Sequence, residues 1–178
     1  LSVSTRGEMS QQRTILVTGS SSGIGAAIVD RLLADGHKVI GIARRPQAHR
    51  PESRFTAVSL DLSDVCKRPE KLARVVQEHP QIDAVVSNAG DGLFEPLDNL
   101  SPKQINEFFN LNLLAHIHLA RVCVPSLKTR GGGDFILIGS ESALRGARRG
   151  TLYCTAKFGL RGFAQSLRAE CGQKNVRV

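Results

Sequence analysis

The sequence predicts an α/β fold, a doubly wound parallel sheet between two layers of helices, and three observations lead to this prediction. Short runs of β-branched and aliphatic residues recur along the 178 residues, as in strands that are buried on both faces. Between these runs, apolar residues stand three and four positions apart, which is the spacing of amphipathic helices. A turn rich in glycine joins the first run to the first helical segment.

The first strand, turn, helix and second strand form a predicted βαβ unit over residues 14–43. The turn contains Gly19, Gly23 and Gly25, and the helix ends at Gly36. One glycine permits the sharp reversal, one lets a pyrophosphate approach the backbone, and one lets the helix pack against the strand. The N-terminus of the helix would offer unpaired N–H groups to that phosphate. Because a strand precedes the turn and a helix follows it, the unit indicates dinucleotide binding rather than a plain turn.

Strands and helices continue to alternate after this unit. Pro69 opens the next helix, and Ser101 followed by Pro102 has the form of an N-cap with proline at the first helical position. The helix that begins there is the longest, and its apolar pattern continues to Pro125. The remaining predicted segments are a loop from Arg45 to Pro51, strands at 55–62, 82–88 and 134–139, a turn at the glycines 131–133, and a helix from Thr151 to Glu170.

Length and composition indicate one domain. Single domains commonly have roughly 100–200 residues, and 41% of this chain is hydrophobic. Residues 1–12 are polar and without periodicity, so we expect a disordered tail or a cloning remnant before a domain at 13–178. No apolar stretch approaches the ~18 residues that span a bilayer, and the N-terminus lacks the apolar core of a signal peptide. We therefore expect a cytoplasmic protein without a membrane partner.

The cysteines indicate neither disulfide bonds nor a metal site. Cys66, Cys123, Cys154 and Cys171 are widely spaced, lie mostly within predicted helices and form no CxxC pair. We expect four reduced, buried thiols and no bound metal.

The basic composition raises the question of nucleic-acid binding. The net charge is +8 and the pI is about 9.9, and clustered Lys and Arg are the electrostatic footprint of phosphate binding. Here the basic residues are scattered, and one Tyr and no Trp offer no platform on which bases could stack. We interpret most of the charge as a solvated face and expect no nucleic-acid partner, while a basic nucleic-acid binder stays open as an alternative.

A tyrosine and a lysine four positions apart in the last helix suggest acid–base chemistry. Tyr153 and Lys157 would share one helical face. A free tyrosine has a pKa near ~10, and lowering it by one unit takes about 1.4 kcal/mol of preferential stabilisation of the phenolate. Two opposite charges ~4 Å apart attract by ~4 kcal/mol at an effective dielectric of ~20, before desolvation of the lysine is deducted. In isolation, this pattern is common by chance, and a half-buried aromatic beside a solvated lysine would be the favoured interpretation.

Ser140 and Asn112 extend the pattern. Ser140 ends the preceding strand, at the carboxyl edge where ligands bind, and Asn112 lies midway along the long helix. Taken singly, the serine could be a cap or turn residue and the asparagine a solvent-facing one. In this order along the chain, the motifs resemble the classical short-chain dehydrogenase/reductase family from Arg13 to Val178. The matching motifs are TGSSSGIG at 18–25, SNAG at 87–90, Asn112, Ser140 and YCTAK at 153–157.

The resemblance implies a Rossmann-type domain of an oxidoreductase that interconverts a carbonyl compound and an alcohol by hydride transfer. It implies that Tyr153 is the general acid and base, and that Lys157 lowers its pKa and binds the nicotinamide ribose. Ser140 would polarise the substrate oxygen, and Asn112 would keep a water in the proton relay behind the lysine. Besides Tyr153 and Lys157, the implied cofactor contacts are Thr18, Gly19, Ser20, Ser22, Gly23, Ile24, Gly25, Arg44, Arg45, Asp61, Leu62, Asn88, Ala89 and Gly90. Ser87 stands where the family more usually has asparagine, and we expect this change to touch nothing catalytic.

The end of the second strand predicts the cofactor. NAD-selective sites normally place Asp or Glu there, and that carboxylate repels a 2′-phosphate. In the family's frame Ala43 takes this position and Arg44 follows it, so we expect NADP(H) to be preferred over NAD(H). Ser20 could add a hydroxyl donor. The alternative is that Arg44 and Arg45 only begin a solvated loop.

The chain ends at Val178, where the family would enter its next strand. We therefore expect the C-terminal strands and the lid that covers the substrate to be absent from this chain. Leu93, Phe94 and Leu144, near the expected mouth of the site, suggest a partly apolar small-molecule carbonyl compound or alcohol as the substrate.

The long helix and the catalytic helix would carry more apolar surface than one side of a sheet can cover, including Phe109, Leu113, Leu160 and Phe163. In the family, these two helices pack against their counterparts in a second subunit, so we expect a homodimer or homotetramer. A dinucleotide-binding protein without turnover, with a regulatory or interaction role, stays open as an alternative.

Overall fold

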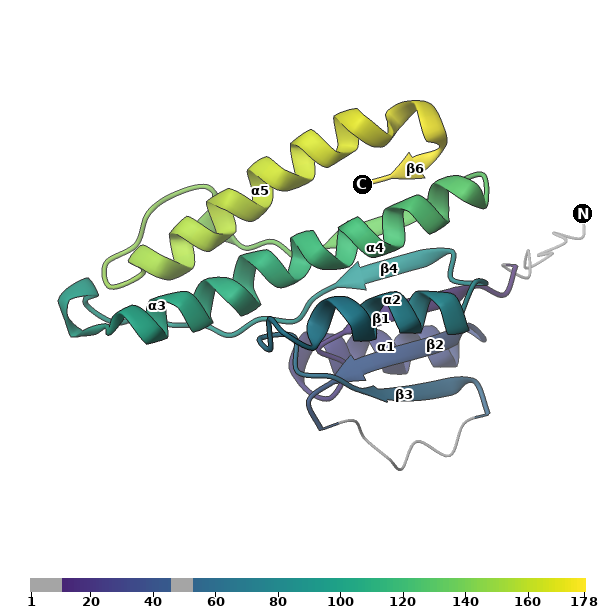
Figure 1. The fold of residues 1–178 in the computed structure, drawn as a ribbon, viewed down its shortest axis with the longest axis horizontal. Helices are drawn as coiled ribbons and strands as arrows, with labels where there is room; N and C mark the ends of the chain where they lie inside the picture. The colour runs from purple at the N-terminus through teal and green to yellow at the C-terminus, as the bar shows by residue number, and fades with distance from the viewer. Residues whose placement is uncertain (1–10, 46–52) are drawn as a thin grey trace, which may run out of the picture.

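Six parallel strands form one sheet in residues 11–45 and 53–178, the part of the chain that the computed structural model describes. Their order is β3-β2-β1-β4-β5-β6, so the chain builds outward from β1 in one direction and then in the other. The doubly wound α/β fold predicted from the sequence is confirmed (Figure 1). The strands are β1 (Thr14–Thr18), β2 (Lys38–Ala43), β3 (Phe55–Ser59), β4 (Ala84–Ser87), β5 (Gly133–Leu137) and β6 (Val176–Arg177).

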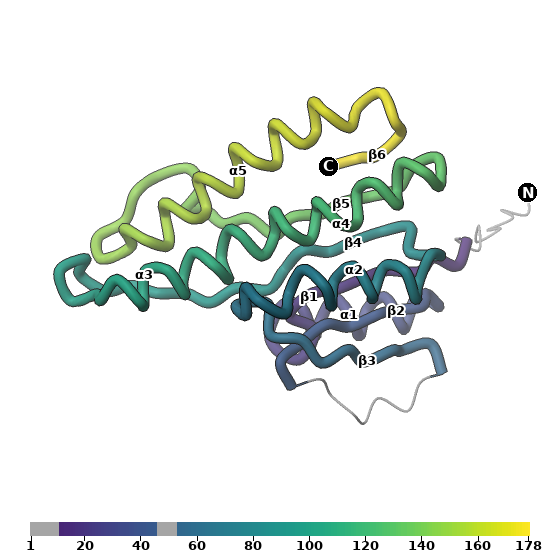
Figure 2. The backbone as a smooth tube through the Cα atoms, in the orientation of Figure 1, coloured from purple at the N-terminus to yellow at the C-terminus, as the bar shows by residue number. Residues whose placement is uncertain are grey.

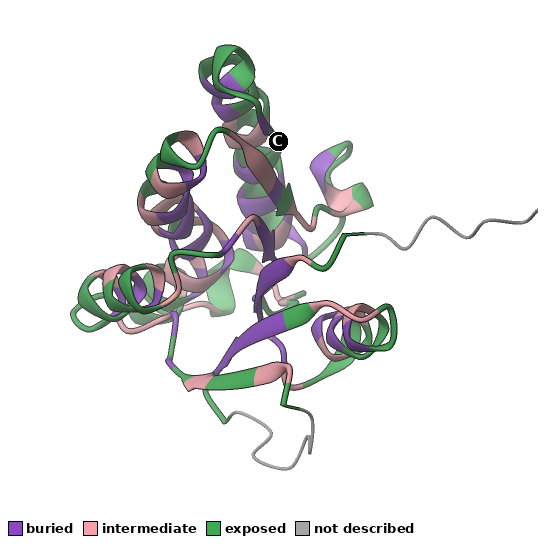
Figure 3. Cartoon of the chain, turned by 90° about the vertical axis from the view of Figure 1, so that its right-hand side faces the viewer, coloured by how far each residue is buried: buried purple, intermediate pink, exposed green. Residues whose placement is uncertain are grey.

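Helices cover both faces of the sheet, but not equally. One face packs against α2 (Arg68–Glu78), α4 (Ala115–Thr129) and α5 (Thr151–Cys171), and the other packs against α1 (Gly23–Ala34). Figure 1 shows α2 and α4 in front of the sheet and α1 behind it, and Figure 3 shows the buried residues gathered between these layers. On the sheet face that packs against α1, this helix covers only the half formed by β1, β2 and β4. Ile136 of β5, which lies on the uncovered half, is therefore exposed.

The predicted long helix is a composite of three parts. It consists of α3 (Pro102–Phe109), the π-helical turn η2 (Asn110–Leu114) and α4, and Figure 2 shows that they follow one another along one continuous path. Its predicted start is confirmed: the Ser101 hydroxyl accepts from the Gln104 N–H at 3.3 Å, while the Gln104 side chain accepts from the Ser101 N–H at 3.0 Å. The sequence analysis did not predict the π-helical turn.

Several predicted boundaries shift by a few residues. The third strand ends at Ser59 rather than at residue 62, because the chain leaves the sheet after the Leu60 N–H donates to the Ala43 carbonyl and turns at Asp61. The long helix does not end at Pro125 but continues to Thr129, whose hydroxyl donates to the Pro125 carbonyl at 3.0 Å. Residues 46–51 of the predicted loop lie outside the described residues, as do residues 1–10 of the predicted tail.

Ion pairs join the N-terminal ends of four neighbouring strands. Arg13, just before β1, forms ion pairs with Asp83 at 2.9 Å and with Asp134 at 2.7 Å. Asp134, in β5, also pairs with Arg177 of β6 at 2.6 Å. These contacts tie β1, β4, β5 and β6 together at the edge of the sheet opposite the cleft described below.

The cysteines are free thiols throughout the described residues. Cys123, Cys154 and Cys171 are buried, whereas Cys66 is exposed, so the expectation of a buried thiol is wrong there. Cys66 lies in the turn before α2 rather than within a helix, which leaves its side chain in solvent. Within residues 11–45 and 53–178, no cluster of His, Cys, Asp and Glu has the make-up of a metal site. Across the same residues, no helix is both long enough and apolar enough to cross a membrane.

Candidate active site

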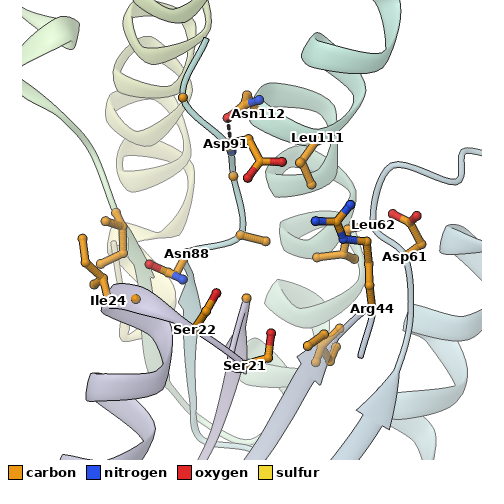
Figure 4. Close-up of a pocket in the computed structure, with 18 of the residues that line it drawn as sticks. Ser21, Ser22, Ile24, Arg44, Asp61, Leu62, Asn88, Asp91, Leu111 and Asn112 are labelled. Atoms are coloured by element: carbon orange, nitrogen blue, oxygen red, sulfur yellow. Dashed lines mark hydrogen bonds between the residues drawn. The ribbon is translucent and has the colours of Figure 1, made fainter. Parts of the chain in front are cut away.

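A cleft of about 370 Å³ opens at the carboxyl ends of the central strands. Its walls come from the glycine turn, the ends of β2 and β3, the segment after β4, the π-helical turn and α5 (Figure 4). The predicted site residues that line it are Gly19, Ser22, Gly23, Ile24, Arg44, Arg45, Asp61, Leu62, Asn88, Ala89, Gly90, Asn112, Tyr153 and Lys157. Thr18, Ser20, Gly25 and Ser140 are not among the lining residues.

The glycine turn brings the N-terminus of α1 to the cleft. Gly19 and Gly23 have φ angles of 69° and 53°, a backbone region that residues with a Cβ rarely adopt. Gly25 is needed for space, because a Cβ there would overlap the carbonyl oxygen of Gly19. The N-cap residue Ser22 makes no side-chain cap bond. The first N–H groups of α1 and the positive end of its dipole are therefore available to an anion such as a phosphate.

Thr18 fastens the segment after β4 to the end of β1. Its hydroxyl oxygen accepts hydrogen bonds from the N–H groups of Asn88 at 2.9 Å and Ala89 at 3.1 Å. The Asn88 side chain donates to the Thr18 carbonyl at 3.0 Å. Thr18 is buried behind the cleft, so it shapes the wall through its two neighbours.

Tyr153 and Lys157 lie one turn apart on α5, and both line the cleft. The Lys157 Nζ atom is 5.8 Å from the centroid of the Tyr153 ring and donates to the Ile138 carbonyl at 3.1 Å. Burial lowers the pKa of Lys157 below its usual value. The Phe94 ring lies 5.3 Å from the Tyr153 ring, centroid to centroid, and covers it with apolar surface. The Tyr153 ring is thus close to both a cation and an aromatic ring.

Asn112 lies in the π-helical turn and is 1% exposed, so the alternative of a solvent-facing asparagine is wrong. Its Nδ2 donates to the Phe108 carbonyl at 3.1 Å, and its Oδ1 accepts from the Asp91 N–H at 3.0 Å, the contact that is dashed in Figure 4. The side chain therefore joins the long helix to the segment after β4. This contact also places Asp91 and Gly92, which the sequence analysis did not identify, along the cleft.

Two of the three predicted serine contacts, Ser140 and Ser20, do not line the cleft. Ser140 lies three residues beyond the end of β5, where its hydroxyl accepts from the Ser142 N–H at 3.1 Å and caps a short 3-10 helix. Ser20 is buried, and its hydroxyl would be 2.8 Å from a Cβ added to Gly41. The neighbouring hydroxyl of Ser21 lines the cleft instead. Sequence position alone did not reveal that Ser21, rather than Ser20, lines the cleft beside Ser22.

A buried pair beside the site was missed by the sequence analysis. The Ser87 hydroxyl lies 2.7 Å from Nδ1 of His116, which follows Asn112 by one helical turn. Burial, followed by the positive charge of Lys157, lowers the pKa of His116 to about 4. The signal in the sequence was that both residues are polar within otherwise apolar runs.

The other end of the cleft is formed by β2, β3 and the long helix. Arg44 and Arg45 follow β2 directly, are exposed and line the cleft with Ala43. In Figure 4, Arg44 lies beside Leu62 and near Asp61, and Leu111 lies close to the tip of its side chain. This part offers a cationic group, a carboxylate and two apolar side chains to a ligand. Leu111 was not identified from the sequence.

Comparisons with known proteins agree with this arrangement. The family described as short chain dehydrogenase matches residues 13–178. The chain is 29% identical over 183 residues to a 7alpha-hydroxysteroid dehydrogenase of Bacteroides fragilis, covering 94% of this chain and 69% of that protein. It is 30% identical over 174 residues to human retinol dehydrogenase 8, covering 92% of this chain and 56% of that protein.

A solved structure shares both the fold and part of the sequence. A metagenomic short-chain oxidoreductase in complex with NADP superimposes with a TM-score of 0.86 at 30% identity, over 93% of this chain and 79% of that one. The chain spans about two thirds of the length of the hydroxysteroid dehydrogenase and little more than half of the length of retinol dehydrogenase 8. With the family match running from Arg13 to the last residue, the chain belongs to the short-chain dehydrogenase/reductase family.

Proposed function

We propose that this chain carries the cofactor site and catalytic residues of an NADP(H)-dependent oxidoreductase that interconverts a carbonyl compound and an alcohol. The observation that carries the proposal is that Tyr153, Lys157 and Asn112 line the same cleft as the glycine turn. The residues fit a dinucleotide: the N-terminus of α1 is uncapped by side chains, and no Cβ at Gly25 closes the turn. When bound, the nicotinamide would supply or accept the hydride.

Tyr153 moves the proton in the proposed reaction. In reduction, the phenol O–H donates its proton to the carbonyl oxygen of the substrate as the hydride reaches the carbonyl carbon, and in oxidation the phenolate takes that proton back. The ammonium of Lys157 favours the phenolate, and the Ile138 carbonyl holds this cation in place at 3.1 Å. A proton returning to Tyr153 would come from the side of Asn112 and pass along Lys157 to the phenolate.

Ser140 is proposed to polarise the substrate oxygen. Its hydroxyl oxygen accepts from the Ser142 N–H, which leaves the hydroxyl hydrogen free to be donated. Rotation of the hydroxyl about its own Cβ–Oγ bond would direct that hydrogen to a substrate beside Tyr153. Phe94 and Leu144 are 50% and 64% exposed, and they support a substrate with an apolar portion next to the reacting carbon.

The preference for NADP(H) is proposed from the end of β2. No carboxylate follows this strand directly, and the exposed Arg44 and Arg45 line the cleft. Asp61, the acidic residue nearby, follows β3 instead. A guanidinium can hold a 2′-phosphate through paired hydrogen bonds. The NADP complex of the metagenomic relative is consistent with this proposal.

A homodimer or homotetramer in the cytoplasm is proposed for the whole protein. Phe109, Leu113 and Phe163 are half-buried in the chain and can contribute to an interface. Leu160 cannot, because it is 2% exposed and already covered within the chain. Phe158 of α5 and Leu114 of the π-helical turn are exposed apolar residues that the sequence analysis did not single out.

The test is cofactor binding by the full-length protein, followed by a panel of ketones and aldehydes. We expect NADPH to bind, and its fluorescence to decline with at least one apolar carbonyl substrate. Binding without turnover across the panel would favour the non-catalytic alternative. Absence of binding by NADPH and NADH alike would overturn the proposal.

A further inference from the structure

Arg68, the first residue of α2, has a buried guanidinium without a carboxylate beside it. The side chain is 1% exposed and is the largest of the fully buried side chains in the described residues. Asp64 attracts the charge from a distance, but no Asp or Glu in the described part of the chain forms an ion pair with it. Its neutralising partners are therefore carbonyl dipoles.

Those carbonyls belong to two segments that each contribute a residue to the lining of the cleft. Nη1 of Arg68 donates to the Leu62 carbonyl at 2.7 Å and to the Asn110 carbonyl at 2.9 Å. Leu62 follows β3, and Asn110 is the first residue of the π-helical turn that contains Leu111. Leu62 and Leu111 both line the cleft. One guanidinium nitrogen thus links the two segments that carry these leucines.

Stability alone does not explain an arginine at this position. Burying a cation against neutral carbonyls is costly, and an apolar side chain of similar volume is often neutral or favourable for folding. The free-energy cost of burying Arg68 is higher still, because its Nε is buried without a hydrogen-bond partner. Burial also lowers the pKa of Arg68 below its usual value. An arginine does, however, present its donors on a planar, rigid group, which suits it to holding two carbonyls at a set separation.

We propose that Arg68 is a positioning residue for the adenosine half of the cofactor. By bonding both carbonyls, it sets the separation of Leu62 and Leu111, which line the same part of the cleft and lie close to Arg44 in Figure 4. A planar base between two leucines needs that spacing to be kept. The proposal rests on dinucleotide binding in this cleft, but not on which dinucleotide is preferred.

Fragments of the cofactor separate this role from a general structural one. ADP represents the half that NAD and NADP share near Leu62, and nicotinamide mononucleotide represents the half near Tyr153. In calorimetric titrations of the full-length protein, Arg68→Met should raise the Kd of ADP at least tenfold and leave the Kd of nicotinamide mononucleotide within twofold. In steady-state assays, the KM of the dinucleotide should rise while kcat stays within about threefold.

A matched control lies on the same helix. Arg74 is exposed and pairs with Glu78 alone among the described acidic residues, at 2.7 Å. Arg74→Met makes the same chemical change six residues further along α2, and it should leave both titrations unchanged. Arg68→Lys keeps the charge but lacks the planar group, and it should raise the Kd of ADP at least threefold. If Arg68→Met does not fold, the Kd of ADP for Arg68→Lys tests the proposal in its place.

Three results would overturn the proposal. The first is a folded Arg68→Met protein that binds ADP within twofold of the unaltered protein. The second is an equal loss of affinity for ADP and nicotinamide mononucleotide, which would show a general distortion of the fold. The third is an unaltered protein that binds neither fragment nor any whole dinucleotide, and this result would overturn the proposed function as well.

Discussion

Ser87 and His116 form a buried hydrogen-bonded pair, with 2.7 Å between the serine Oγ and the histidine Nδ1. Ser87 ends β4, directly before the segment that lines the cleft, and its carbonyl accepts from the Ile138 N–H at 3.1 Å. Ile138 in turn offers its carbonyl to Lys157. The pair is therefore linked through Ile138 to Lys157, whose positive charge is one of the causes that lower the pKa of His116.

We predict that His116 makes the fold sensitive to mild acid. An unfolded histidine gains a proton near pH ~6.5, whereas burial and Lys157 hold the pKa of folded His116 at about 4. The associated stability is fully present above pH ~6.5 and is lost as the pH falls towards ~4, which amounts to roughly 2 kcal/mol between pH ~7 and ~4.5. The His116→Gln variant lacks this titrating group. Between pH ~7 and ~4.5, its free energy of unfolding should therefore fall by roughly 2 kcal/mol less than that of the unaltered protein.

Urea denaturation of both proteins at the two pH values measures this difference. Other acid-sensitive groups contribute equally to both proteins, so they cancel in the comparison. NMR of the histidine rings gives an independent check, because the His116 ring should remain neutral at pH ~5. A His116 ring that titrates near pH ~6.5 in the folded protein would contradict the prediction.

A second prediction concerns the ion pairs at the opposite edge of the sheet. Asp134 is largely buried and is bonded by both Arg13 and Arg177, and its pKa is lowered, first by the hydrogen bond from Arg177 and then by that from Arg13. Arg177 is far more exposed than Arg13. Exposed pairs contribute about 0–1 kcal/mol, so Arg13→Ala should lower the free energy of unfolding more than Arg177→Ala does.

The pH dependence of this network follows from the lowered pKa of Asp134. The carboxylate contributes stability above its unfolded pKa of ~3.9, and this contribution is lost as the pH falls through the lower folded pKa. Asp134→Asn should therefore lower the free energy of unfolding at pH ~7, and it should lower it by a smaller amount at pH ~2. An equal effect of the substitution at both pH values would show that the charge of Asp134 does not stabilise the fold.

The parts of the site that could be predicted from the sequence depend on local geometry. The glycines are required by backbone angles and by space within one turn, and Tyr153 and Lys157 share a face because helical spacing demands it. The positions of Ser140 and Ser20 were harder to predict, because a hydroxyl's direction depends on the path of the chain around it. The π-helical turn and the contacts of Arg68 and His116 arise from packing between distant segments, which periodicity within one segment does not reveal.

A third prediction tests the proposed acid. Tyr153→Phe should abolish turnover while NADPH affinity changes little, because only the ionisable hydroxyl is removed and the ring contact with Phe94 is kept. Lys157→Ala should impair both turnover and cofactor binding, since it removes the cation and a proposed ribose contact. Stopped-flow hydride transfer and fluorescence titration measure the two effects separately. Turnover by Tyr153→Phe within a few fold of the unaltered protein would exclude this role for the tyrosine.

The last prediction concerns the choice of cofactor at the end of β2. NADP(H) should bind at least tenfold more tightly than NAD(H), which corresponds to about 1.4 kcal/mol. The reason is that no carboxylate at Ala43 repels the 2′-phosphate, and that Arg44 and Arg45 line this part of the cleft. Because both arginines are exposed, the preference should shrink as the salt concentration rises.

Substitution at the two positions separates repulsion from attraction. Arg44→Leu alone should reduce the preference by weakening NADP(H) binding, whereas Ala43→Asp together with Arg44→Leu should reverse it by adding the repulsive carboxylate. Arg45→Leu shows how the attraction is divided between the neighbouring arginines, and Arg31→Leu on the exposed face of α1 controls for the loss of one positive charge. Fluorescence titration of each of these four variants with NADPH and with NADH gives its ratio of the two Kd values. If the unaltered protein binds the two cofactors equally, the arginines after β2 do not recognise the phosphate, and the preference proposed here is wrong.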